Sequence, residues 1–205
     1  MENDEAKSTS AISSGVSMFS LQAPTPLGVG FTWQSSLKSA LGRGWELLDF
    51  LEATPDVLCR ETIADGQRRL AYHPPLLKEA LAAAQELPIV IHGLGLSIGS
   101  ATGWDEEYLR ILDEFHERQS FRWHSDHLAF LLTTTPEGEP LHTGIPLPLP
   151  FTEEALDLLV PRAAAMNARY GVPFLLENLT YYLPGLPSEN GWDEIAFLNE
   201  LTSRS

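Results

Sequence analysis

The chain has 205 residues, of which 43% are hydrophobic, and this is enough apolar material for one substantial core. Its formal net charge of −15 argues against nucleic acid and anionic membranes as partners, because both are themselves negatively charged. The polar, acidic start and the short apolar runs argue against a signal peptide and a membrane span, so we expect a cytoplasmic protein.

Residues 1–20 are rich in Ser, Thr, Glu and Asn, so we expect a flexible tail there. Residues 21–205 are expected to form a single domain. The one cysteine, Cys59, cannot form a disulfide within the chain, which agrees with a reducing compartment. We interpret Cys59 as a small buried hydrophobic residue rather than a nucleophile.

Five short apolar runs are predicted to be β-strands. Their apolar residues are nearly continuous rather than alternating, which favours parallel strands that are covered on both faces. In chain order they are residues 27–31, 45–53, 88–92, 121–130 and 173–179. A long loop is expected between the fourth strand and the helix that follows it.

A stretch with helical periodicity follows each predicted strand. In chain order these helices are residues 35–41, 73–87, 105–118, 152–170 and 192–201. His73 is expected to start the second helix. Thr152 is a predicted cap of the fourth helix, and Pro161 lies too far inside that helix to occupy its first turn, so we expect a kink or a break there.

This alternation predicts an α/β fold with a parallel sheet. Two architectures fit. One is an open doubly wound sheet, and the other is part of a (β/α)₈ barrel, for which about 250 residues are typical. In both, functional side chains are expected at the carboxyl ends of the strands.

Three predicted strands end on residues that can bind a metal ion. His92 ends the third strand, His127 lies in the SDHL group at the end of the fourth, and Glu177 ends the fifth. Two imidazoles and a carboxylate are common ligands of iron, manganese or zinc. A single histidine at a strand end is more often structural, but an unpaired carboxylate after four apolar residues is costly to bury and usually marks a function.

The remaining polar residues near these strand ends are open to several interpretations. Asp126 could bind the metal, support a ligand or be an ordinary loop acid. His124 is three residues from His127, so the two side chains should point to opposite faces of the strand. His116 and His142 are expected to be solvated.

Six motifs, taken together and in order, resemble the family of multinuclear non-haem iron oxidases that includes the methanobactin-biosynthesis enzyme MbnB and its relative TglH. The motifs are LGVGF, LLDFLEATPD, IHGLGLSIGS, SDHLAF, PLPFTEEALDLL and PFLLENLTYYL. The resemblance implies a (β/α)₈ TIM barrel of the xylose-isomerase-like kind with two or three irons. It also implies the use of O₂ to modify cysteines of ribosomally made precursor peptides, which a partner protein usually presents.

Carried over by position, the resemblance makes His92, His127 and Glu177 metal ligands. It implies catalytic roles for Glu177 and Asp126, and it implies that Asn178 helps to bind the cofactor. In the family, the remaining ligands come from strands six to eight, whereas this sequence contains five predicted strands. We therefore expect a partial TIM barrel, about five strand-helix units long, that binds iron, with two or three irons as in the family or fewer.

Two other functions stay open. A truncated barrel could be a non-catalytic binding or assembly subunit that pairs with a second copy or with a complementary half-barrel. Alternatively, the chain could be a mononuclear metal-dependent isomerase or endonuclease on the same type of barrel, although the acidic charge argues against a nuclease.

Overall fold

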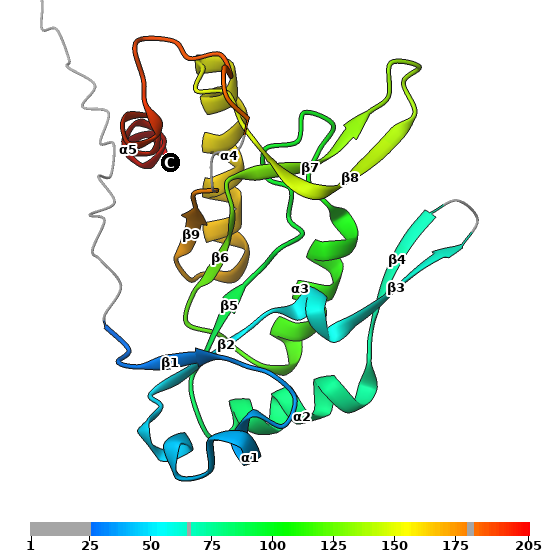
Figure 1. The fold of residues 1–205 in the computed structure, drawn as a ribbon, viewed down its shortest axis with the longest axis vertical. Coiled ribbons are helices and arrows are strands. Elements are labelled where there is room, and N and C mark those ends of the chain that lie inside the picture. Colours follow the sequence, from blue (N-terminus) through cyan, green and yellow to red (C-terminus); the bar gives the residue numbers. More distant parts are fainter. Residues whose placement is uncertain (1–25, 65–66, 180–182) are drawn as a thin grey trace, which may run out of the picture.

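The structure is a computed structural model that describes residues 26–64, 67–179 and 183–205. The predicted flexible tail at residues 1–20 lies outside this part of the chain. Five parallel strands form the central sheet in the order β1-β2-β5-β6-β9 (Figure 1). They are β1 (Gly30–Thr32), β2 (Phe50–Ala53), β5 (Ile89–His92), β6 (His124–His127) and β9 (Phe174–Glu177).

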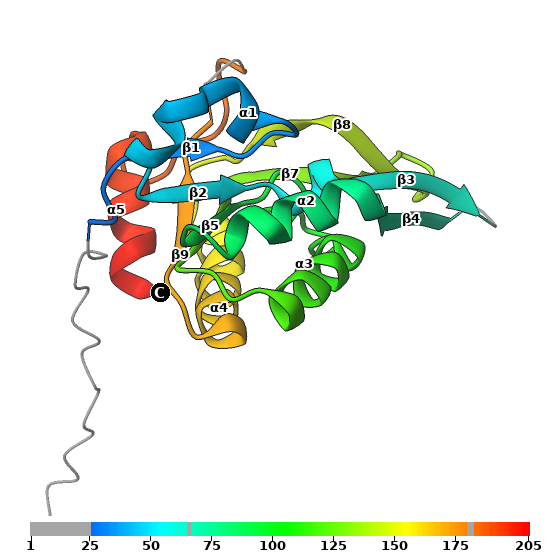
Figure 2. The same ribbon diagram turned by 90° about the horizontal axis from the view of Figure 1, so that it is seen from below.

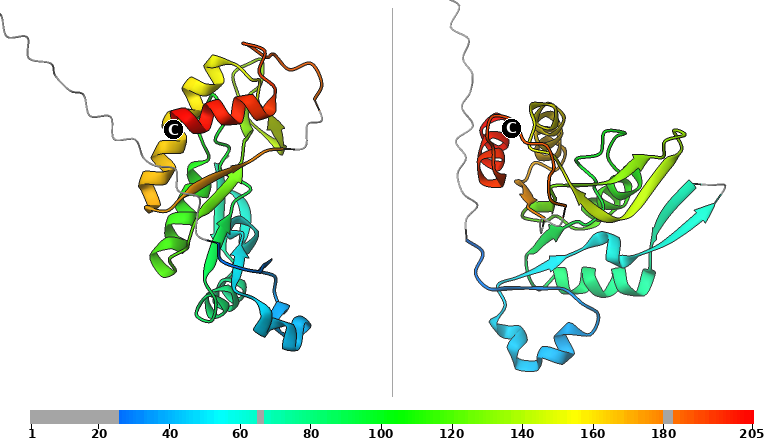
Figure 3. Two further views of the ribbon diagram at one scale, coloured as in Figure 1. Left: turned by 90° about the vertical axis from the view of Figure 1, so that its left-hand side faces the viewer. Right: turned by 45° about the horizontal axis from the view of Figure 1, so that its top comes forward.

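Helical segments follow each strand of the sheet. They are α1 (Leu37–Leu41), η1 (Gly42–Leu47), η2 (Pro55–Leu58), α2 (Pro74–Ala84), α3 (Glu106–Arg118), α4 (Glu153–Tyr170) and α5 (Glu194–Arg204). Helices α2, α3 and α4 lie together on one side of the sheet (Figure 2). Helices α4 and α5 pack against each other beside β9 (Figure 3). The fold is therefore α/β with a parallel sheet, as in a partial TIM barrel.

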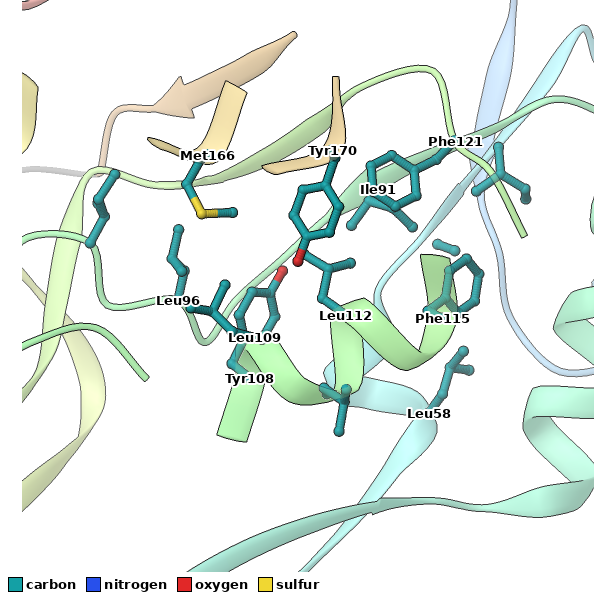
Figure 4. Packing of buried hydrophobic residues seen from close by; sticks show 14 of the residues in the cluster. Leu58, Ile91, Leu96, Tyr108, Leu109, Leu112, Phe115, Phe121, Met166 and Tyr170 are labelled. Carbon is teal, nitrogen blue, oxygen red and sulfur yellow. The ribbon is translucent and has the colours of Figure 1, made fainter. Parts of the chain in front are cut away.

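The core lies between the sheet and this helical layer. Helix α3 is amphipathic, and its residues Leu109, Leu112 and Phe115 are buried toward Ile91 of β5 (Figure 4). Asp105 caps this helix by accepting a hydrogen bond from the main-chain N–H of Tyr108 at 2.9 Å. The cap and the apolar stripe explain why this segment forms a helix that packs on the sheet.

Two antiparallel hairpins were not anticipated from the sequence. The first joins β3 (Cys59–Ala64) to β4 (Gln67–Tyr72), and the second joins β7 (Ala129–Thr134) to β8 (Pro140–Pro148). Both hairpins extend on the same side of the molecule (Figure 1). The predicted fourth strand is thus two strands in different sheets, and much of the predicted long loop is β8.

Two other expectations about the elements were wrong. The strand predicted from residue 45 begins only at Phe50, because the preceding segment forms η1, in which Trp45 is buried and donates to Glu86 at 3.1 Å. Of the kink or break expected at Pro161, the break is absent, since helix α4 continues through this residue. The proline removes one main-chain donor, while burial of Leu156, Leu159 and other apolar residues holds both halves against the core.

The roles predicted for two histidines have different outcomes. His73 precedes α2 as its N-cap, as expected. His116 is not solvated, because its ring packs against Phe121 and Tyr170 with centroid distances of 4.9 and 5.2 Å. Of the helices that the structure describes, none combines the length and apolarity needed to cross a membrane.

Candidate metal centre

Three adjacent strands of the sheet bring His92, His127 and Glu177 together at their carboxyl ends. One ligand atom from each residue lies within 4.8 Å of the other two. His92 Nε2 is 3.4 Å from Glu177 Oε2. The two imidazole rings meet edge to face, with centroids 5.1 Å apart. The strand ends therefore form a compact group of two imidazoles and one carboxylate.

The register of the sheet explains this convergence. His127 of β6 pairs with Glu177 of β9, and Ser125 of β6 pairs with His92 of β5. Side chains two residues apart on a strand point to the same face, so Ser125 and His127 face the same way as His92 and Glu177. This is the face opposite the helical layer that buries His124 and Asp126.

The spacing and chemistry of the three side chains fit a metal ion. Two atoms that each lie about 2.1 Å from one ion are at most about 4.2 Å apart. The three ligand atoms lie close to this limit, and the Glu177 side chain, which is 55% exposed, can rotate to adjust its carboxylate. Nitrogen and carboxylate donors together suit iron, manganese or zinc.

The electrostatic environment of His127 favours the neutral form that binds metals. Burial lowers its pKa, the positive form of His92 lowers it further, and Glu177 opposes both effects. His127 Nδ1 is buried and has no hydrogen-bond partner among the described residues. An unpaired buried nitrogen is costly, so it would gain from a bound cation or from an added donor.

The structure does not bring Asp126 into the cluster. Its side chain lies on the helical side of β6, where its oxygens accept hydrogen bonds from the main-chain N–H groups of Leu96 and His127 at 3.2 and 2.7 Å. Burial, and next the charge of Asp56, raise the pKa of Asp126 to about 8. Its connection to the cluster therefore runs through the main chain of His127.

Asn178 directly follows Glu177, and its exposed side chain lines a small cavity with Leu128, Leu149 and Phe151. His124 faces away from the cluster, as the alternation of side chains along a strand requires. Tyr108 Oη lies 3.0 Å from its Nε2, and burial followed by the nearby charge of His92 lowers the pKa of His124 to about 3. His124 is thus a neutral core residue.

Sequence reasoning missed three polar residues around the centre. Glu52 of β2 shares the face of the cluster and accepts a hydrogen bond from Thr32 at 2.9 Å. Asp56 follows β2, accepts from the N–H of Leu94 at 3.1 Å, and has a pKa that burial raises to about 6. Ser125 contacts the His92 ring. The feature of the sequence that could have pointed to Glu52, Asp56 and Ser125 is that each lies near the end of a predicted strand.

A comparison with known families identifies the relatives of this chain. The model of the family described as "RiPP precursor modification enzyme MbnB/TglH/ChrH" matches residues 27–205. The chain belongs to this family. Membership in the MbnB/TglH/ChrH family confirms the resemblance drawn from the six motifs.

Several proteins named "UPF0276 protein" are similar to part of the chain. One from Anaeromyxobacter sp. (strain Fw109-5) is 36% identical over 121 residues, which cover 59% of this chain and 40% of the relative. One from Caulobacter vibrioides is 34% identical over 124 residues, or 60% of this chain and 42% of the relative. One from Haemophilus influenzae is 32% identical over 123 residues, which cover 60% of this chain and 38% of the relative. The chain thus matches less than half the length of these relatives.

Proposed function

We propose that the chain contributes to an iron-dependent enzyme that uses O₂ to modify a cysteine of a ribosomally made precursor peptide. The observation that carries this proposal is the convergence of His92, His127 and Glu177 at one rim, within 4.8 Å of one another. Membership in a family of precursor-modifying enzymes supports the same function. The substrate peptide and a protein that presents it are the partners we propose.

The two histidines and Glu177 would hold the iron. When bound there, iron supplies a site for O₂ and for a substrate thiolate. His127 contributes a neutral imidazole because burial disfavours its charged form. Glu177 keeps the centre in contact with solvent, since its side chain is 55% exposed, and a peptide could approach from that side.

The cysteine of this chain is a poor candidate for the substrate thiol. Cys59 lies at the start of β3, and its Sγ contacts the carbonyl oxygen of Pro55 at 3.4 Å. Burial, and next the charge of Asp56, raise the pKa of this thiol to about 12. The thiolate is the reactive form of cysteine, so Cys59 is largely unreactive at neutral pH, and the substrate thiol is supplied by another molecule.

Iron binding by the full chain tests this proposal. We expect the protein, purified without oxygen and mixed with Fe(II), to retain about one iron or more per chain after desalting. His127→Ala and Glu177→Ala should each reduce the retained iron at least about tenfold, because each removes one of few ligands. Elemental analysis together with protein concentration measures the ratio.

Two matched variants control for non-specific binding. His142→Ala and Glu137→Ala remove exposed residues of the same types from the β7–β8 hairpin, outside the cluster. Both should retain as much iron as the unmodified chain. Equal iron content in all four variants would contradict the proposal, and retention of zinc or manganese in preference to iron would favour the mononuclear isomerase or endonuclease instead.

A second candidate function is an assembly subunit that pairs with a second copy of the chain. Strand β9 lies at an edge of the sheet and, among the described strands, pairs only with β6. Its residue Leu175 is 37% exposed on the face that carries the cluster. An apolar strand edge of this kind is a ready site for pairing with another chain.

A further inference from the structure

The Ser125 hydroxyl lies between the imidazole of His92 and the main chain of β5. Its Oγ is 3.0 Å from His92 Nδ1 and 3.1 Å from the carbonyl oxygen of Ile91. We propose that Ser125 is a positioning residue that fixes His92 as its Nδ1–H tautomer and so keeps the Nε2 lone pair directed into the cluster. This role rests on the proposed function insofar as it makes His92 a metal ligand.

The donor and acceptor chemistry of the three groups leads to this assignment. A serine hydroxyl has one hydrogen to donate, whereas a carbonyl oxygen can only accept. When Ser125 donates to Ile91 O, its oxygen is left to accept a hydrogen bond from His92 Nδ1–H. A neutral imidazole has only one N–H hydrogen. With that hydrogen on Nδ1, His92 Nε2 is unprotonated and has a lone pair.

The tautomer of His92 affects metal binding because Nε2 is the ring nitrogen that faces Glu177. The distance from Nε2 to Glu177 Oε2 is 3.4 Å. In the Nδ1–H tautomer, both atoms present lone pairs to each other, an arrangement that a cation between them would stabilise. In the other tautomer, Nε2–H would donate to the carboxylate, and that internal hydrogen bond would compete with metal binding.

His127, unlike His92, has no hydrogen-bond partner at Nδ1 among the described residues, although this nitrogen is buried. The two imidazoles of the cluster therefore differ in how their orientation is fixed. His92 is held by a side chain of the neighbouring strand, and the Ser125–His92 register pair makes that contact a direct result of the sheet.

The tautomer of His92 can be measured without any metal. We expect long-range ¹H–¹⁵N correlation spectra of the metal-free full chain to show the neutral His92 imidazole protonated at Nδ1. Comparison with His92→Asn assigns the signal. Ser125→Ala should shift His92 toward the Nε2–H form, and Ser125→Thr, which keeps the hydroxyl, should restore the original pattern.

Iron affinity gives a second readout. Loss of a group that orients a metal ligand typically lowers metal affinity about 10- to 100-fold, so we expect this loss in Ser125→Ala and recovery in Ser125→Thr. A spectrum of the unmodified chain with His92 protonated at Nε2 would overturn the inference, even if iron binds. The expected tautomer in a chain that binds no iron would overturn the proposed function and leave the role of Ser125 intact.

Discussion

Among the charged side chains, Glu107 links helix α3 to the β3–β4 hairpin. Its carboxylate accepts hydrogen bonds from Arg69 at 2.7 Å, from the main-chain N–H of Leu70 at 3.1 Å and from Arg110 at 3.0 Å. Burial would raise the pKa of Glu107, but these donors outweigh burial and lower it from 4.5 to about 2. One carboxylate thus satisfies donors from two elements that are far apart in sequence.

This lowered pKa predicts an acid-dependent contribution to stability. The contribution is present above about pH 4.5 and is lost as the pH falls toward about 2, because the folded protein favours the ionised form. At neutral pH we expect Glu107→Gln to lower the free energy of unfolding by about 1.5–3 kcal/mol, the usual value of hydrogen bonds to a charged group. The difference from the unmodified chain should shrink as the pH is lowered. Urea denaturation over a series of pH values measures it.

Glu106→Gln is the matched control for this prediction. Glu106 is exposed in the same first turn of α3, so it experiences the same helix dipole without the three donors that contact Glu107. We expect an effect below about 0.5–1 kcal/mol. Equal losses for the two variants at neutral pH would show that the hydrogen bonds of Glu107 contribute nothing specific.

Among the elements, the end of β5 depends on a glycine. A Cβ atom at Gly93 would overlap the Tyr108 hydroxyl of α3 and the Asp126 carboxylate of β6. The missing side chain lets the loop after His92 pass close to both groups, and the N–H of Leu96 in this loop donates to Asp126. Close packing of β5, β6 and α3 therefore requires a glycine directly after His92.

Gly93→Ala should destabilise the fold and disturb the cluster. We expect a loss of about 1–3 kcal/mol in the free energy of unfolding, the usual cost of overpacking, because Tyr108 and Asp126 must shift. Gly44→Ala is the control, since a Cβ there has 3.8 Å of clearance from its nearest neighbour, and it should leave stability nearly unchanged. Denaturant midpoints compare the two variants, and a Gly93→Ala variant as stable as the original would refute this account of β5.

The elements also show where sequence patterns succeed. The strands that end on His92 and Glu177 were predicted because each is a short apolar run next to a polar end. The hairpin strands β3, β4 and β8 were missed because their residues are largely exposed, so they lack a continuous apolar signal. Local patterns reveal buried strands better than strands that are stabilised only by pairing.

For the molecule as a whole, the sheet ends in two strands that carry exposed apolar side chains. Leu175 of β9 is 37% exposed, and Val29 and Phe31, which lie in or next to β1, are 64% and 46% exposed. Barrels avoid open strand edges by closing on themselves. The relatives from Anaeromyxobacter and Caulobacter are more than twice as long as the segment that matches this chain.

We expect the chain to self-associate through the β9 edge. Sedimentation velocity should show larger species as the concentration of the unmodified protein rises. Leu175→Lys should shift the distribution toward the monomer, because a charge on an edge strand opposes pairing. Ile195→Lys, which replaces a 71% exposed residue on α5, is the control and should not change the distribution. Identical behaviour of all three proteins would exclude pairing at this edge.

The five parallel strands and the convergence of His92, His127 and Glu177 followed from the sequence, because parallel strands place their carboxyl ends at one rim. The tertiary structure alone decided the order of the strands, the hydrogen bond that Asp126 accepts from the Leu96 N–H, and the contact of Ser125 with the His92 ring. The physical reason is that buried strands, their polar ends and the alternation of their side chains can be read from local patterns. The order of the strands, and the partner that each side chain meets across the sheet, depend on contacts and a register that form only when the strands pair.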